Sequence, residues 1–192
     1  MVTTAARTGS IAGRRAGRSR PKAVFDVSTV WKQVTPGLEA ELLEFWQRHH
    51  AIGDPERARQ RVPQVVCIAR DHAGALCAVS TAVVRVLPRI GEPLYYFRLF
   101  FSKSVRGQGQ VVPMFNRARA ELQDYNASLP QPESIGMLVE LESRHLSAEH
   151  RRAHVDEGDS YFVGYSLRGL QLRVSYFQGA VLTNAPRAGQ RR

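Results

Sequence analysis

Cysteine is scarce in this sequence, and long apolar runs are missing. The 192 residues include two cysteines, Cys67 and Cys77, whose spacing fits neither a disulfide framework nor a CxxC metal motif. We therefore expect structural thiols, no metal site and a reducing, cytoplasmic compartment. No apolar run reaches the length of a membrane span, and no signal-peptide core precedes the first predicted strand, so we expect no transmembrane helix.

Acidic residues are missing from both ends of the chain. Residues 1–23 carry six basic side chains and residues 181–192 carry three, which together account for nine of the net charge of +10. The basicity therefore says little about the ligand of the folded part. We expect basic, disordered tails at 1–23 and 181–192 around one domain at 24–180. Contact of the tails with nucleic acid or acidic lipid stays open, as does an organelle transit peptide at 1–23.

Hydrophobic periodicity predicts alternating strands and helices. Strands are predicted at 27–34, 64–70, 76–86, 95–101, 135–141, 162–167 and 172–177, and helices at 36–49, 55–61, 112–125 and 147–156. The turn at 71–74 predicts an antiparallel hairpin, and the strand–helix–strand order across 95–141 predicts a right-handed crossover between parallel strands. The predicted fold class is therefore α/β with a mixed sheet.

The stretch between strand 95–101 and helix 112–125 has the most chemical content. It is a polar turn that contains Gly107 and Gly109, where the missing Cβ lets a ligand approach the backbone. The following helix begins with N–H groups that have no intrahelical partner, and Pro113 is tolerated in its first turn. Because these N–H groups carry the positive end of the helix dipole, the turn predicts an anion-binding site.

Arg106 and Gly109 match the acyl-CoA loop of the GNAT acetyltransferase superfamily, whose pattern is Gln/Arg-x-x-Gly-x-Gly/Ala between a strand and a long helix. The order of predicted elements over residues 30–177 also resembles the GNAT order. The resemblance implies a central mixed sheet of about six to seven strands flanked by helices, with acetyl-CoA as co-substrate. The pantetheine arm would lie along strand 95–101 and the diphosphate on the loop. The implied cofactor-binding residues are Phe100, Phe101, Ser102, Arg106, Gly107, Gln108, Gly109, Gln110 and Val111.

Acetyl transfer to an amine requires a base, a donor to the developing oxyanion and a proton for the departing thiolate. Glu140 and Glu142 lie two residues apart at a strand end and so share a face, which makes them candidates for the base if burial raises their pKa. Tyr161 and Tyr165, placed near the position of the superfamily's tyrosine, are candidates for the acid. A solvated strand end explains the two glutamates equally well, and packing explains the two tyrosines.

The function that these features predict is an N-acetyltransferase that acts on a primary amine by direct attack, with no covalent enzyme intermediate. A small amine, a protein N-terminus or lysine, and a polyamine would each need an acidic or apolar pocket between the first two helices and the last hairpin. Candidates for its wall are Trp46, His49, His50 and Arg57.

Two alternatives remain open from the sequence. One is a GNAT-like domain with weakened catalysis that binds a ligand or partner, because Val111 replaces the usual Gly or Ala and helix 147–156 contains no tyrosine. The other is a nucleic-acid-associated protein that acts through its basic tails. The sequence does not set the oligomeric state, and a homodimer is one option.

Overall fold

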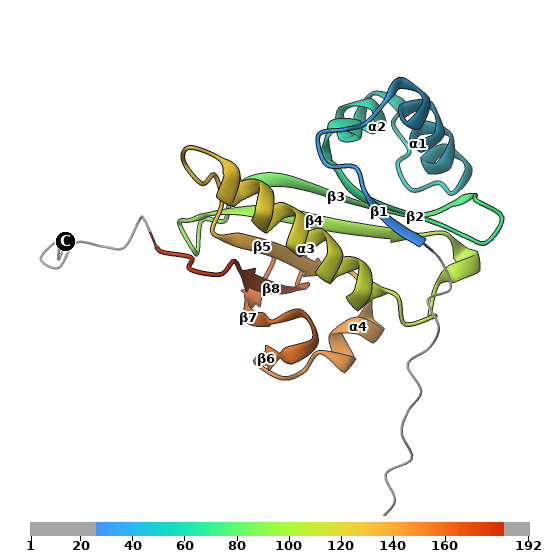
Figure 1. Cartoon of the computed structure of the whole chain (residues 1–192). Coiled ribbons are helices and arrows are strands. Elements are labelled where there is room, and N and C mark those ends of the chain that lie inside the picture. Colours follow the sequence, from blue (N-terminus) through green and yellow to red (C-terminus); the bar gives the residue numbers. More distant parts are fainter. Residues whose placement is uncertain (1–25, 183–192) are drawn as a thin grey trace, which may run out of the picture.

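An eight-stranded mixed sheet forms the centre of the computed structural model, which describes residues 26–182 (Figure 1). The strand order is β1-β2-β3-β4-β5-β8-β7-β6, with β4 and β5 parallel and every other neighbouring pair antiparallel. The strands are β1 (Asp26–Thr29), β2 (Val65–Arg70), β3 (Leu76–Val86), β4 (Pro93–Phe101), β5 (Gly136–Leu141), β6 (His154–Val155), β7 (Ser160–Tyr165) and β8 (Gln171–Tyr176). The predicted mixed α/β sheet is confirmed.

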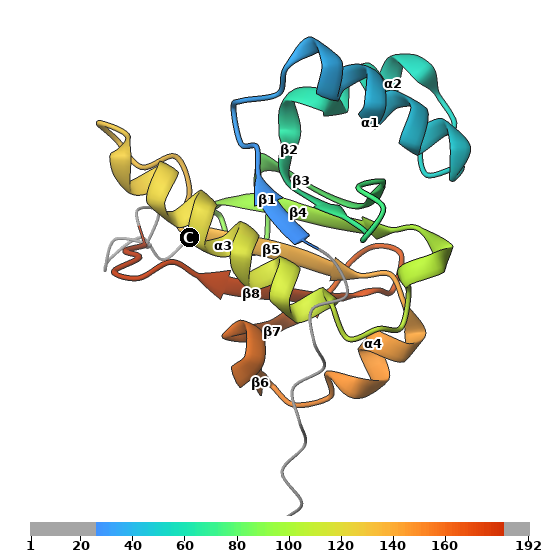
Figure 2. The ribbon, with the colours of Figure 1, turned by 45° about the vertical axis from the view of Figure 1, so that its right-hand side comes forward.

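Helices cover both faces of this sheet. They are α1 (Pro36–Arg48), α2 (Pro55–Arg61), α3 (Val111–Ser128) and α4 (Arg144–Glu149), with short 3-10 turns η1 (Val62–Gln64), η2 (Lys103–Val105) and η3 (Asp156–Gly158). In Figure 1, α3 crosses one face of the sheet, and α1 and α2 lie together beside β1, β2 and β3. Figure 2 shows α4 beyond the end of β5, beside the N-terminal end of α3.

The first two helices begin where local capping signals place them. The Thr35 hydroxyl accepts a hydrogen bond from the Leu38 N–H at 3.3 Å, and the Asp54 carboxylate accepts one from the Glu56 N–H at 2.9 Å. Proline follows each cap, at the position where a missing N–H costs nothing. The apolar stripe of α1 packs against β2 and β3 and includes Trp46, which is 2% exposed. Trp46 is therefore a core residue, and its predicted place in a pocket wall is wrong.

The opposite face of the sheet packs against α3. Met114, Phe115, Ala118 and Leu122 of α3 are buried against Tyr95 and Phe97 of β4 and Met137 of β5. Burying the larger of these side chains contributes on the order of 2 kcal/mol each, which holds α3 across the sheet. The loop that enters α3 is therefore fixed at both ends, by β4 and by the helix.

The two parallel strands separate part of the way along their length. Backbone pairing between β4 and β5 runs from Tyr95–Met137 to Phe97–Val139 and stops there. Beyond it, β4 continues to Phe101 paired with β3, and β5 continues to Leu141 paired with β8. Within residues 26–182, residues 98–100 of β4 thus have no neighbouring strand on the side of β5, and this stretch is the free edge of β4.

Three predicted elements differ from the structure. The first strand ends at Thr29, because the chain turns at Lys32, whose φ angle is 60°. The last helix begins three residues earlier than predicted, because the Ser143 hydroxyl caps it by accepting from the Leu146 N–H at 3.4 Å. The chain after α4 forms the short strand β6 and the turn η3. With β6 the sheet has eight strands, where six to seven were expected. The predicted tails lie outside the described residues except for residues 181–182.

Candidate active site

The loop between β4 and α3 presents a row of backbone N–H groups. Gly107 and Gly109 have φ angles of 78° and 71°, a left-handed conformation that glycine adopts without steric cost. A Cβ at either position would meet no atom within 4 Å, so the space beside both glycines is open. Within residues 26–182, no protein acceptor receives a hydrogen bond from the N–H groups of residues 107–111. These N–H groups are available to an anion.

Side chains of the loop bind its carbonyl groups and leave those N–H groups free. Gln108 Nε2 donates to the Ser104 carbonyl at 3.0 Å, and Gln110 Nε2 donates to the Gln108 carbonyl at 3.3 Å. The Ser102 and Ser104 hydroxyls share a hydrogen bond of 2.8 Å, and the Ser102 N–H donates to the Cys77 carbonyl at 2.9 Å. The protein therefore holds this loop in shape by itself, which lowers the ordering cost of binding a ligand.

Positive charge surrounds the loop. The sequence between Glu92 and Glu121 contains no acidic residue. The Arg106 side chain is exposed, its Nε donates to the Phe101 carbonyl at 2.9 Å, and its guanidinium carbon lies 5.2 Å from the centre of the Phe100 ring. The positive end of the 18-residue α3 adds to this field, since no side chain caps that helix. A phosphate group is favoured here over a neutral ligand.

Val111, which replaces the usual small residue of the motif, is the first residue of α3. Its side chain is 36% exposed, so it is not part of the buried core. Phe100 and Phe101 are half-buried on opposite faces of β4, Phe100 with the α1 cluster and Phe101 with the α3 cluster. The predicted cofactor residues therefore form one continuous segment, from the free edge of β4 through the loop to the start of α3.

The two carboxylates at the end of β5 share one arginine. Arg168 Nη2 donates to both Glu140 and Glu142 at 2.9 Å, and the Tyr96 hydroxyl donates to Glu140 at 2.5 Å. Burial alone would raise the pKa of Glu140. Hydrogen bonds from Arg168, Ser166 and Tyr96 outweigh burial and lower that pKa to about 2. The expected raised pKa is thus wrong for Glu140, because a carboxylate of such low pKa is a weak proton acceptor.

The lowered pKa predicts how Glu140→Gln changes stability with pH. The folded state favours the ionised carboxylate, so its contribution is full above the ordinary pKa of 4.5 and is lost as pH falls toward 2. We expect the wild type to exceed the variant in free energy of unfolding by about 2–3 kcal/mol at neutral pH, and by much less near pH 2. Urea unfolding at both pH values measures this difference.

Glu142→Gln is the matched control for that experiment. Its side chain is 66% exposed, so its pair with Arg168 is screened by solvent and the variant should cost no more than about 1 kcal/mol. An effect of Glu140→Gln that stays constant between the two pH values would contradict the assignment of a low pKa to this carboxyl.

The two predicted tyrosines lie at different levels of the sheet. Tyr165 pairs with Gln171, which in turn pairs with Leu141, so Tyr165 lies level with the end of β5 and two strands away. Tyr161 lies near the other end of β7, where its ring stacks on His154 with centroids 4.4 Å apart. Both side chains are exposed. The structure brings Glu140 and Glu142 together but groups neither tyrosine with them, and the catalytic role of all four stays a prediction.

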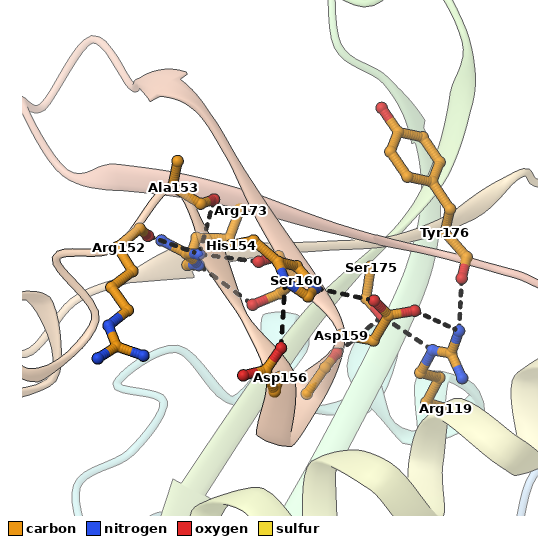
Figure 3. Close-up of polar contacts among 11 residues, drawn as sticks. Arg119, Arg152, Ala153, His154, Asp156, Asp159, Ser160, Arg173, Ser175 and Tyr176 are labelled. Atoms are coloured by element: carbon orange, nitrogen blue, oxygen red, sulfur yellow. Dashed lines mark hydrogen bonds and ion pairs between the residues drawn. The ribbon is translucent and has the colours of Figure 1, made fainter.

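A polar network fastens the segment between α4 and β8 (Figure 3). The buried Arg173 side chain donates to the carbonyl groups of His150, Arg152, Ala153 and Ser160 at 2.8–3.2 Å, and to the Ser160 hydroxyl at 3.1 Å. From α3, Arg119 donates to the Ser175 hydroxyl and the Tyr176 carbonyl and lies 3.6 Å from Asp159. A surface hollow of about 500 Å³ adjoins this network. It is lined by Arg119, Gln123, Asp159, Tyr161, Tyr176, Phe177 and Gln178.

Comparisons with known proteins support the fold. No protein-family model matches the sequence, and no curated protein sequence matches it. The ribosomal-protein-S5-alanine acetyltransferase of Vibrio fischeri has 10% identity and a TM-score of 0.54, with 84% of this chain and 97% of that chain covered. The GNAT-superfamily phosphinothricin acetyltransferase of Sinorhizobium meliloti, solved with acetyl-CoA, has 12% identity and a TM-score of 0.53, with 87% and 97% covered.

A third structure is the dodecameric spermidine N-acetyltransferase of Vibrio cholerae, with 10% identity, a TM-score of 0.51, and 86% and 100% of the two chains covered. At these identities the similarity concerns the fold. The chain has the GNAT fold, as the glycine loop and the order of elements predict, and the match extends over most of the described residues.

Strand alternation puts Arg98 on the same face as Tyr96, so its place beside that ring follows from the sequence. The contribution of Arg168 has no sequence signal, because a hairpin loop brings it to the two glutamates. Among the described residues, no helix is long and apolar enough to cross a membrane, and no group of three ligating side chains could hold a metal.

Proposed function

We propose that this chain is an acyl-CoA-dependent N-acyltransferase that moves an acetyl group from acetyl-CoA to a primary amine. The observation that carries the proposal is the combination of a partly unpaired β4 edge with a preformed loop of free N–H groups. The loop fits a diphosphate, because a Cβ at either of its two glycines would meet only open space and residues 93–120 contain no acidic side chain. The edge of β4 fits an extended amide chain such as pantetheine, which can pair with free strand backbone.

In this proposal the N–H groups of residues 107–111 hold the diphosphate, and Arg106 adds charge from the side. Bound acetyl-CoA supplies an activated acetyl thioester. The acceptor nitrogen forms a C–N bond as the C–S bond breaks, one proton of the ammonium form passes to solvent, and one returns to the sulfur. Backbone N–H groups at the end of β4 are suited to donate to the developing oxyanion.

The observed contacts support some of the predicted catalytic residues better than others. Glu142 is the better supported proton acceptor, through water, because it lies exposed at the end of β5 whereas Glu140 has a pKa of about 2. Tyr165 is the better supported acid, because it lies level with the end of β5. Two buried free thiols, Cys67 and Cys77, support a reducing compartment, and we place the activity in the cytoplasm.

Acetyl-CoA should stabilise the protein against unfolding. A ligand that binds only the folded state adds about 2.7 kcal/mol at a hundred times its dissociation constant. We expect this gain in thermal unfolding with acetyl-CoA, and none with the acetyl thioester of N-acetylcysteamine, which lacks the diphosphate. Equal gains, or no gain with either compound, would contradict the role of the loop.

Turnover separates this function from a GNAT-like domain with weakened catalysis. That second candidate is favoured by α4, which carries no tyrosine between Arg144 and Glu149. Release of CoA thiol in the presence of an amine panel supports the enzyme. Acetyl-CoA binding without thiol release from any amine supports the binding domain.

A further inference from the structure

Four arginines from three elements lie on the sheet face that carries α1 and α2. On β4, Arg98 follows Tyr96 by two residues, so the two side chains share this face. Arg85 of β3 is paired with Leu94 of β4, which lies on the same face because it precedes Tyr96 by two residues. The guanidinium carbons of Arg98 and Arg85 lie 4.4 Å and 5.2 Å from the centre of the Tyr96 ring. Arg61 of α2 is half-buried and close enough to Arg98 and Arg85 to be repelled by their charges, and Arg57 lies one helical turn before it.

In the part of the chain that the structure describes, these four arginines have no carboxylate partner. No ion pair is formed by Arg57, Arg61, Arg85 or Arg98 within residues 26–182. Burial lowers the pKa of Arg61, and repulsion from its three arginine neighbours lowers it further, with a small opposing effect of Glu142. Grouped like charges without a counter-ion are unfavourable, so their arrangement is that of a site that gains an anion on binding.

The carboxylates nearby do not neutralise this cluster. Glu140 and Glu142 are both bonded to Arg168, so two carboxylates stand against five guanidinium groups and positive charge remains in excess. The cluster also lies next to the end of β5, where the Tyr96 hydroxyl meets Glu140. Positive charge and an exposed carboxylate are thus adjacent, a pattern that suits a ligand carrying both an oxyanion and an ammonium group.

We propose that the acceptor is an amine that itself carries a carboxylate or phosphate group, held by Arg98, Arg61 and their neighbours with its ammonium group toward Glu142. This inference rests on the proposed function and names the substrate class of the same site. It replaces the expectation of an acidic or apolar pocket, because the face beside the β5 end is basic. A polyamine would be repelled here, because the guanidinium groups outnumber the carboxylates.

Matched amine pairs test the acceptor class. In the first pair phenylalanine carries a carboxylate that phenethylamine lacks. In the second pair phosphoethanolamine carries a phosphate that ethanolamine lacks. Spermidine serves as the polycation. We expect kcat/KM to be at least tenfold higher for the anionic member of one pair than for its neutral member. Arg98→Gln should raise the KM of the anionic member about tenfold and change the KM of the neutral member by less than about twofold. Arg59→Gln is the control, because Arg59 lies on α2 and is paired with Glu56 at 3.6 Å. This variant should leave the KM of both members unchanged.

Calorimetric binding of the same compounds in the presence of CoA keeps the test independent of turnover. Binding of an anionic amine that Arg98→Gln weakens supports the proposal. If acetyl-CoA still binds, any of three results overturns the proposal. These are a preference for neutral amines or spermidine, binding of the anionic amine that Arg98→Gln does not change, and no binding of either anionic compound. Failure of acetyl-CoA to bind overturns the proposed function instead, so the two failures are distinguishable.

Discussion

Gly109→Val should weaken acetyl-CoA binding at least a hundredfold. A valine Cβ at this position would enter the open space beside the free N–H groups, where the diphosphate must approach the backbone. The φ angle of 71° also strains a branched residue by roughly 1–2 kcal/mol, which would shift the loop away from its preformed shape. Calorimetric titration of the variant with acetyl-CoA measures the loss.

Gly74→Val separates the loss of the site from general strain. Gly74 has a φ of 81° in the hairpin between β2 and β3, and a Cβ there would also meet nothing within 4 Å. We expect both variants to lose similar stability in thermal unfolding, and Gly74→Val to bind acetyl-CoA like the wild type. Near-wild-type affinity in Gly109→Val would show that the diphosphate does not contact this loop.

Arg173→Met should destabilise the fold by about 3–5 kcal/mol, the range expected when a buried, hydrogen-bonded charge loses its network. Arg173 is 2% exposed and holds four carbonyl groups of residues 150–160, which methionine would leave buried without donors. These bonds connect β8 to the segment that packs on α3 through Asn116 and the Glu157 carbonyl at 2.8 Å. Chemical denaturation measures the loss.

Arg151→Met is the control for this effect. Arg151 belongs to the same segment but is exposed, so its replacement should change the free energy of unfolding by less than about 0.5 kcal/mol. A loss from Arg173→Met no larger than that from Arg151→Met would show that the network contributes little to stability.

The elements that sequence predicts well are those with local signals. Thr35-Pro36 and Asp54-Pro55 fix the starts of α1 and α2 because cap and proline act within one turn. The predicted strand at 76–86 has the bounds of β3, because a continuous apolar run and a hairpin turn define it. The start of the last helix differs from the prediction because both Ser143 and Ser147 can cap a helix, and the Ser143 hydroxyl is the one that accepts from the Leu146 N–H.

The chemistry at the end of β5 depends on contacts between distant residues, and the sequence predicts it less well. Spacing predicts that Glu140 and Glu142 share a face. Spacing does not predict that Arg168 and Tyr96 hold the pKa of Glu140 at about 2, because these two partners lie 28 and 44 residues away from it in the sequence. The open shape of the glycine loop was predictable because it depends on backbone groups within a few residues.

Residue-resolved NMR titration with acetyl-CoA tests the central claim most directly. We expect the largest amide shifts at residues 107–111 and along the free edge of β4, with saturation at a single dissociation constant. Unchanged loop amides, with shifts confined to another place such as the hollow beside Arg119 and Asp159, would contradict the claim that this loop binds the diphosphate.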